Sequence, residues 1–236
     1  MKKTIFRRTV SFLLAVLTVL TTLVVVPFTA SATEADVTIT TPEELLDFIT
    51  STVSNSYAGK TIVLANDIDL TGHDWRVPQW LSAEQPGTFS GTFDGQGHNV
   101  KITSSHDASG KPHFYMFNVL DGATVKNMSV ELSGVTCNAN ESAIANGTTN
   151  GTLIENVYVS GELAYNVSGN RYSGGMVSNI SGDTTFKNCV VATTITGVGT
   201  SLGGFVGQLG GDVTVTFDNC AFIGSVSTGR RIPING

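Results

Sequence analysis

The sequence predicts an all-β fold, a parallel β-helix (solenoid) with a coil period of about 30 residues and an N-terminal amphipathic capping helix. A short element recurs at that interval, Gly, Asn and Asp interrupt the chain every few residues, and only one segment has helical periodicity. The 236 residues are 41% hydrophobic and 14% charged, with 26 glycines and 6 prolines, which excludes a charge-rich disordered chain and collagen. A propeller blade needs a longer period, and strand-like sequence excludes helical repeats.

Residues 1–32 have the layout of a secretory signal peptide. An uncharged apolar stretch at 9–28 follows a basic start, and Ala30-Ser31-Ala32 supplies the small residues of a cleavage site. We expect cleavage after Ala32 and export from the cell, with an uncleaved membrane anchor as the alternative. Removing four of the 13 basic residues leaves 9 against 19 acidic ones, a net charge of −10. This balance disfavours nucleic acid, and after cleavage no membrane segment remains.

Residues 33–59 are predicted to form a polar lead and the capping helix, near 42–54. Thr41 can cap this helix, Pro42 suits its first position, and Glu44 stands where a capping box needs a carboxylate. Apolar residues follow on one face: Leu45, Leu46, Phe48, Ile49 and Val53.

Residues 60–229 are predicted to form the parallel β-helix. Residues 61–64 read as a strand, and Ile68 and Leu70 as a second short one. The repeated element is an apolar residue, any residue, Asn, and an apolar residue or Cys. Its asparagines are Asn127, Asn156, Asn188 and Asn219, at intervals of 29, 32 and 31 residues. An apolar element precedes each (Phe117, Ile144, Val177, Val206), and a glycine follows each (Gly134, Gly161, Gly197, Gly229).

Stacking of like residues on like residues is expected in such a solenoid. Phe186 would lie on Phe217, Cys189 on Cys220, and the four asparagines would form a column of buried amides that bond to one another. We interpret these eight residues as structural. The two cysteines are read as small apolar core residues, with a disulfide between adjacent coils as the alternative that leaves Cys137 as the odd thiol.

A family resemblance rests on three segments. Residues 89–100 (FSGTFDGQGHNV) resemble the G-x-F-D-G-x-G-H-x-I segment of bacterial secreted proteins with GLUG-type repeats. GGFVG at 203–207 and FDNC at 217–220 are close to the same pattern, whereas residues 115–117, 142–144 and 176–178 lack its full glycine content. The resemblance covers residues 40–229 and implies a right-handed, pectin-lyase-like parallel β-helix of the kind found in adhesin-like surface proteins and accessory modules.

No catalytic, cofactor or metal residue is assigned from the sequence. The acidic candidates are Asp67 with Asp69 and Asp94 with Asp74, which we read as turn or cap residues, with calcium binding and glycoside cleavage as alternatives. His98 is read as a structural hydrogen-bonding residue. The polar insertion at 104–112, flanked by His106 and His113, is the predicted variable binding surface.

We expect a non-catalytic secreted or cell-surface module that acts in adhesion, serves as a stalk, or binds a glycan or surface protein. A polysaccharide lyase or glycoside hydrolase is the alternative. Residues 230–236 leave the repeat pattern, so we expect either a truncation point followed by further repeats or a partner that caps the open end.

Overall fold

The computed structural model describes residues 34–73, 87–103, 105–106, 112–113, 115–137, 140, 142–166, 172–198 and 201–228. The predicted signal peptide, residues 230–236 and Asp74 lie outside these residues. All the strands and the helix described below belong to one unit that begins at Ala35. None of the described residues forms a helix with the length and apolar character that a membrane span requires.

The N-terminal helix, α2, runs from Pro42 to Ser51. Thr41 Oγ1 accepts a hydrogen bond from Glu44 N at 3.2 Å, and Glu44 Oε2 accepts one from Thr41 N at 3.3 Å, which is the predicted capping box. The helix ends three residues before the predicted end at 54. Thr52, the C-cap, donates its hydroxyl to Ile49 O at 2.7 Å, and turn residues follow it.

Helix α2 covers the N-terminal end of the core with aromatic contacts. The Phe48 ring lies 5.7 Å from Phe89 and from Phe93, and 6.2 Å from Phe117, all measured between ring centroids. Tyr57 also packs on Phe48, at 5.2 Å, and lies 6.3 Å from Phe89. Because these rings come from α2 and from successive strands, they join the helix to the first coils.

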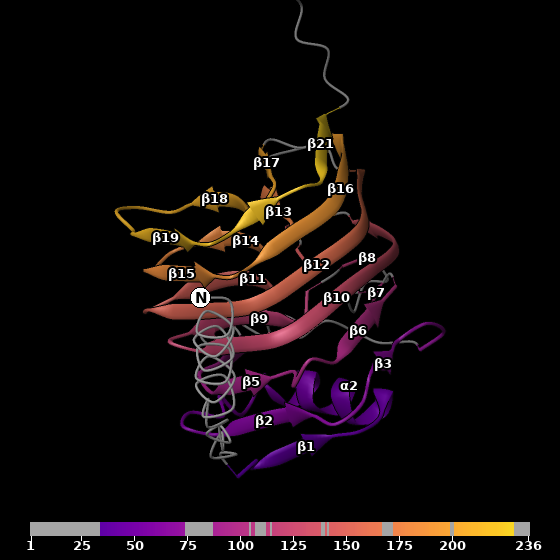
Figure 1. Ribbon diagram of the computed structural model, residues 1–236, viewed down its shortest axis with the longest axis vertical. Helices are drawn as coiled ribbons and strands as arrows, with labels where there is room; N and C mark the ends of the chain where they lie inside the picture. Colours follow the sequence, from indigo (N-terminus) through magenta and orange to yellow (C-terminus); the bar gives the residue numbers. More distant parts are fainter. Residues whose placement is uncertain are drawn as a thin grey trace, which may run out of the picture. The chain divides into compact units, whose positions relative to one another are not determined.

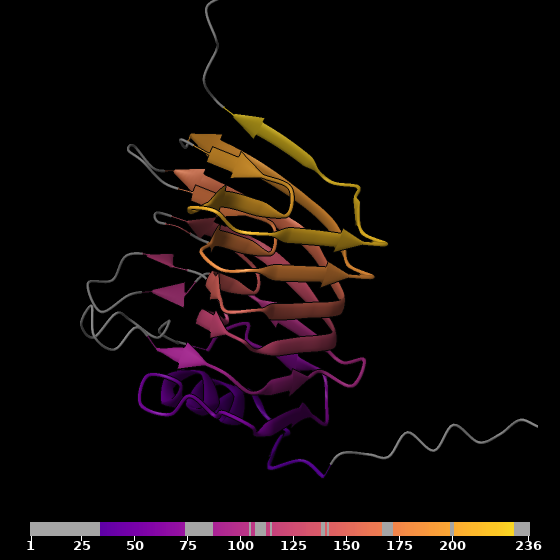
Figure 2. The same ribbon diagram turned by 90° about the vertical axis from the view of Figure 1, so that its left-hand side faces the viewer.

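The larger sheet is a ladder of parallel strands, one from each coil (Figure 1). Its order is β1 (Val37–Ile39), β2 (Thr61–Leu64), β5 (Thr92–Asp94), β10 (Thr124–Cys137), β12 (Thr152–Asn166), β15 (Thr184–Lys187) and β19 (Val215–Asp218). Further along each coil it continues through β3 (Ile68–Asp69), β6 (Asn99–Ile102), β16 (Val190–Val198), β20 (Ala221–Phe222) and β21 (Ser225–Thr228). In Figure 2 the coils lie in chain order, from the indigo strands to the yellow ones.

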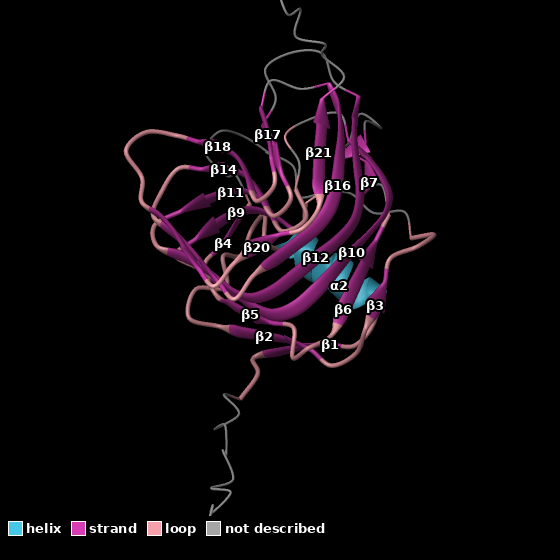
Figure 3. Cartoon of the chain, turned by 45° about the horizontal axis from the view of Figure 1, so that its top comes forward, coloured by secondary structure: helices cyan, strands magenta, loops and turns pink. Residues whose placement is uncertain are grey.

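A second parallel sheet faces the first (Figure 3). It consists of β4 (Thr88–Phe89), β9 (Phe117–Asp121), β11 (Ala145–Thr149), β14 (Val177–Ile180) and β18 (Val206–Leu209). Two small pairs complete the described strands: β13 (Tyr172–Gly174) with β17 (Ser201–Gly203), and the antiparallel hairpin of β7 (Ser105–His106) with β8 (Pro112–His113). The fold is therefore the predicted all-β parallel solenoid.

The core lies between the two sheets and is filled by residues in register. Val125 pairs with Phe93 on one side and Ile154 on the other, and all three side chains are fully buried. Ile154 in turn pairs with Phe186. Each coil thus buries its apolar side chains against those of its neighbours, and in-register stacking supplies the hydrophobic stabilisation of the whole unit.

Two details of the predicted register are wrong. The residue that pairs with Phe117 and Val177 is Ala145, not Ile144, and the Ala145 amide donates to Met176 O as the Val177 amide donates to Phe205 O. Gly161 pairs with Leu132 and Thr193 and does not stack on Gly134 or Gly197, because Gly134, Gly161 and Gly197 stand 7, 5 and 9 residues after the asparagines of their own coils.

Candidate functional site

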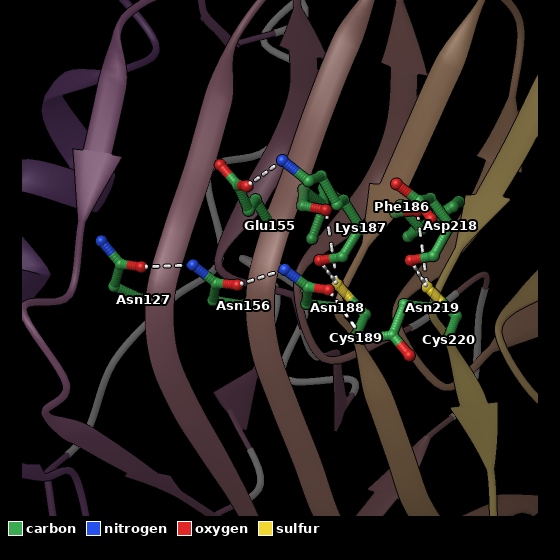
Figure 4. A network of polar contacts seen from close by, with 11 residues as sticks. Asn127, Glu155, Asn156, Phe186, Lys187, Asn188, Cys189, Asp218, Asn219 and Cys220 are labelled. Carbon is green, nitrogen blue, oxygen red and sulfur yellow. Dashed lines mark hydrogen bonds and ion pairs between the residues drawn. The ribbon is translucent and has the colours of Figure 1, made fainter. Parts of the chain in front are cut away.

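The four repeated asparagines form a continuous ladder of amide hydrogen bonds (Figure 4). The Nδ2 atom of Asn156 donates to Oδ1 of Asn127 at 2.8 Å, that of Asn188 to Asn156 at 3.0 Å, and that of Asn219 to Asn188 at 2.8 Å. At the N-terminal end Asn127 Nδ2 donates to Asp94 Oδ1 at 3.0 Å. Every donor points toward the preceding coil, so the ladder has a polarity.

The ladder lies on the surface, and the expectation of buried amides is wrong. Asn156, Asn188 and Asn219 are exposed and Asn127 is half-buried. All four have φ between 51° and 54°, in the left-handed region that Asn tolerates better than other non-glycine residues. The element therefore selects Asn for a tight turn of the backbone, and the side-chain ladder stabilises that turn from coil to coil.

A column of alternating charge lies beside the ladder, and the sequence analysis missed it. The variable position of the repeated element pairs Asp94 with Lys126, Lys126 with Glu155, Glu155 with Lys187, and Lys187 with Asp218. Lys126 Nζ lies 3.4 Å from Asp94 Oδ2, and Lys187 Nζ lies 2.8 Å from Glu155 Oε1. The hydrogen bond to Glu155 raises the pKa of Lys187. The sign of the side-chain charge at this position alternates from coil to coil, and this alternation in the sequence could have predicted the column.

The aromatic and thiol positions of the repeated element also meet. The rings of Phe186 and Phe217 stack with centroids 5.1 Å apart and an interplanar angle of 7°. Cys189 and Cys220 are free thiols, and each donates to two backbone carbonyls, Cys189 at 3.3 Å and Cys220 at 3.4 Å. The side chain of Cys137 lies outside the described residues.

Burial raises the pKa of the Cys189 thiol to about 11. Because the thiolate is the reactive form, we expect iodoacetamide at pH 8 to modify Cys220, which is half-buried, while Cys189 stays intact. Peptide mapping by mass spectrometry would locate the label, and labelling in urea, where both thiols are exposed, is the control. Equal labelling of the two cysteines in the native chain would contradict this assignment, as would a Cys189–Cys220 disulfide that blocks both.

Of the acidic candidates near the start of the solenoid, Asp69 and Asp94 accept hydrogen bonds within turns, whereas Asp67 contacts the next coil. Asp67 Oδ1 accepts from Asn99 N at 2.9 Å and lies 3.0 Å from His98 Nδ1, and these two contacts lower the pKa of Asp67. Asp69 accepts from Thr71 N at 2.8 Å. Asp94 Oδ1 accepts from Gln96 N at 3.0 Å as well as from Asn127.

No group of three or more His, Cys, Asp or Glu side chains within the described residues is arranged to hold a metal ion. The polar insertion at 104–112 is described only in part. Its ends form the β7–β8 hairpin, and the residues between the two strands, with the side chains of His106 and His113, lie outside the described residues.

A groove of about 560 Å³, lined mostly by residues with polar side chains, lies along the outer face of the second sheet. Strands β4, β9, β11, β14 and β18 supply its floor through paired residues: Thr88, Val119, Gly147, Asn179 and Gln208. Its walls carry mostly hydroxyl and amide side chains: Asp121, Asn140, Asn146, Thr149, Asn150, Tyr172 and Ser181. Of its described lining residues, only Asp121 is charged.

Hydrogen bonds fix several of these side chains in place. Asp121 Oδ1 accepts from Thr149 Oγ1 at 2.8 Å and from Asn150 Nδ2 at 2.6 Å. Asn179 Nδ2 donates to Ser181 Oγ at 2.9 Å, and Asn140 Oδ1 accepts from Tyr172 N at 3.0 Å. The walls are therefore preorganised, and their remaining donors and acceptors can bind a polar ligand.

Gly147 keeps the centre of the groove open. A Cβ atom at this position would meet only ordinary contacts, at 3.7 Å from Asn179 O and 3.9 Å from Asn118 O, so a larger side chain would project into the groove. The sequence analysis missed this site because its residues are spread over the coils and belong to no motif. The recurrence of Thr, Asn and Ser after each apolar strand was the available signal.

The sequence of the chain is similar to parts of known immunoglobulin A1 proteases. The chain is 28% identical over 190 residues to the one from Streptococcus sanguinis, and 29% identical over 183 residues to one from Streptococcus pneumoniae. These matches cover 78% and 76% of this chain but only 9% of each relative, so the chain corresponds to a small part of their length. No protein-family model matches the chain.

A solved structure shares the fold. A crystal structure from Bacteroides ovatus, provisionally assigned as an immunoglobulin A1 protease, matches with a TM-score of 0.52 and 20% identity. The match covers 81% of this chain and 67% of that one. At this identity the likeness concerns the architecture alone, which is that of a β-helix.

Proposed function

We propose that the chain is an exported bacterial β-helix module that binds a glycan in the groove of the second sheet. The observation that carries this proposal is the lining of the groove, in which amides, hydroxyls and Tyr172 surround a floor left open at Gly147. Sugar hydroxyls both donate and accept hydrogen bonds, as these side chains do. The phenol ring of Tyr172 offers an apolar face for a pyranose ring.

Export and an accessory role are parts of the same proposal. The signal-peptide layout of residues 1–32 supports export, and the resemblance to GLUG-repeat proteins supports surface display. The match to only 9% of the length of the streptococcal proteases supports a module that accompanies a catalytic domain elsewhere. Glycoside cleavage requires two carboxylates. Among the described lining residues Asp121 is the single carboxylate, and Thr149 and Asn150 already bond to it.

Binding can be tested on a glycan array, followed by calorimetry with the best ligand. We expect Gly147→Gln, which fills the groove, and Tyr172→Ala, which removes its aromatic wall, each to weaken binding at least about tenfold. Tyr158→Ala is the matched control, because Tyr158 is 43% exposed on β12 of the other sheet. Its affinity should equal that of the parent.

Three results would overturn the proposal. The array could yield no ligand, or Gly147→Gln could bind as tightly as the parent. The third is turnover: release of reducing ends or unsaturated products from a polysaccharide would make the chain a hydrolase or lyase, the alternative that the sequence analysis retained.

A further inference from the structure

The last described coil leaves a large apolar surface at the C-terminal end of the solenoid. Five of the six exposed large hydrophobic side chains in the described part of the chain lie there: Leu209, Phe217, Phe222, Ile223 and Val226. Ile223 is 68% exposed and Phe217 is 50% exposed. A hollow of about 260 Å³ lies between β18 and β19, lined in part by Val206, Val215 and Phe217.

This surface repeats an interface that already exists between the coils. β19 is the last strand of the larger sheet and β18 the last of the second, so each has a strand partner on one side. On that side the Phe217 ring stacks on Phe186 and meets Phe205 edge-on, and half of Phe217 stays exposed to solvent. A coil added in the same register would bury the ring between two partners, as Phe186 lies between Ile154 and Phe217 in the sheet.

Two polar columns specify what the added coil must carry. The amide ladder ends on Asn219, whose Nδ2 donates to Asn188 and whose Oδ1 accepts no hydrogen bond within the described residues. The next position therefore calls for an amide donor. The charge column alternates from Asp94 to its last member, Asp218, which is negative and exposed. The next position there calls for a base.

We propose that this end is the docking surface for another β-solenoid coil, whose strand reads apolar, basic, Asn, and then apolar or Cys. The segment Phe186-Lys187-Asn188-Cys189 of this chain has that sequence and makes the corresponding contacts on Ile154, Glu155 and Asn156. The docked coil would continue all three columns and cover the exposed apolar side chains.

A second copy of this chain does not meet these requirements. Joined end to end through a two-fold axis, two copies would bring two Asp218 carboxylates and two Asn219 acceptors to one interface. Joined head to tail, the second copy would present its first strand, β1. There Thr38 occupies the position of the charge column and Ile39 that of the Asn ladder, so neither the base nor the amide is supplied.

The test adds a coil to the full mature chain and measures whether the added coil pairs with β19 in the proposed register. Two extended chains are made, each with its added Asn 31 residues after Asn219, which is the interval from Asn188 to Asn219. One carries Phe-Lys-Asn-Cys and the other Phe-Glu-Asn-Cys. Both are also made with Asp218→Lys, which reverses the required charge. Hydrogen exchange of the β19 peptide is measured by mass spectrometry.

With native Asp218, the lysine coil should slow β19 exchange at least about tenfold relative to the parent chain. The glutamate coil should slow it about two- to threefold less, and Asp218→Lys should reverse this order. Equal protection by the two coils, or no protection by either, would overturn the proposal. So would light scattering that shows the parent chain as a dimer broken by Ile223→Asp, because the occupant would then be a second copy. Glycan binding is a separate readout, so failure here leaves the proposed function to its own test.

Discussion

Replacing Gly161 by Ala should destabilise the chain by more than about 3 kcal/mol, enough to prevent folding in a marginally stable protein. A Cβ atom at this position would lie 2.0 Å from Leu132 O and 2.9 Å from the Leu132 N and C atoms. These are backbone atoms of the preceding coil, so the clash is relieved only by moving one coil off the other. The φ angle of 102° at Gly161 adds strain for any other residue. Urea denaturation followed by circular dichroism measures the effect.

Gly134→Ala is the matched control for this prediction. Gly134 also has a positive φ, 65°, but a Cβ atom there would meet nothing within 4 Å. The substitution therefore costs only the left-handed backbone, about 1 kcal/mol. If the two variants lost the same stability, close contact between coils at Gly161 would be refuted.

Replacing Phe93 by Ala should cost about 3–5 kcal/mol of unfolding free energy. Its ring is fully buried, stacks on Phe48 with centroids 5.7 Å apart, and meets Phe117 edge-on at 5.6 Å. Removal leaves a cavity between helix α2 and the first coils that neither can fill without breaking its own contacts. The midpoint of urea denaturation should fall accordingly.

Phe222→Ala makes the same chemical change at the open end of the solenoid. Phe222 is 39% exposed, so its removal should cost less than about 1.5 kcal/mol. A loss at Phe222 as large as that at Phe93 would mean that the C-terminal end is buried in solution, and it would contradict the exposed surface described above.

Much of the architecture was predictable because it rests on local rules that repeat. The capping box of Thr41 and Glu44 is readable in four residues and occurs as expected. The recurrence of Asn at intervals of 29 to 32 residues predicted a solenoid, and hydrogen bonds between the side-chain amides join residues at those same intervals in the structure. Insertions in the loops change the length of a coil by a few residues but leave its strands stacked, so an approximate period is enough to predict the fold.

The remaining features depend on relations between coils that no single segment contains. Ala145, one residue after the expected Ile144, lies opposite Phe117, and periodicity does not resolve a difference of one residue. The asparagines lie at surface turns with left-handed backbone, and the sequence pattern left both features undetermined. The groove depends on which side chains face outward in five strands, and the absence of a side chain at Gly147 is informative only once these strands are aligned.

In-register stacking of the coils is the central claim, and a crystal structure of residues 33–236 would test it most directly. We predict Nδ2–Oδ1 distances of about 3 Å from Asn156 to Asn127, from Asn188 to Asn156 and from Asn219 to Asn188. Asparagines that lie on different faces of the molecule, or pair out of this order, would contradict the register and with it both the groove and the docking surface.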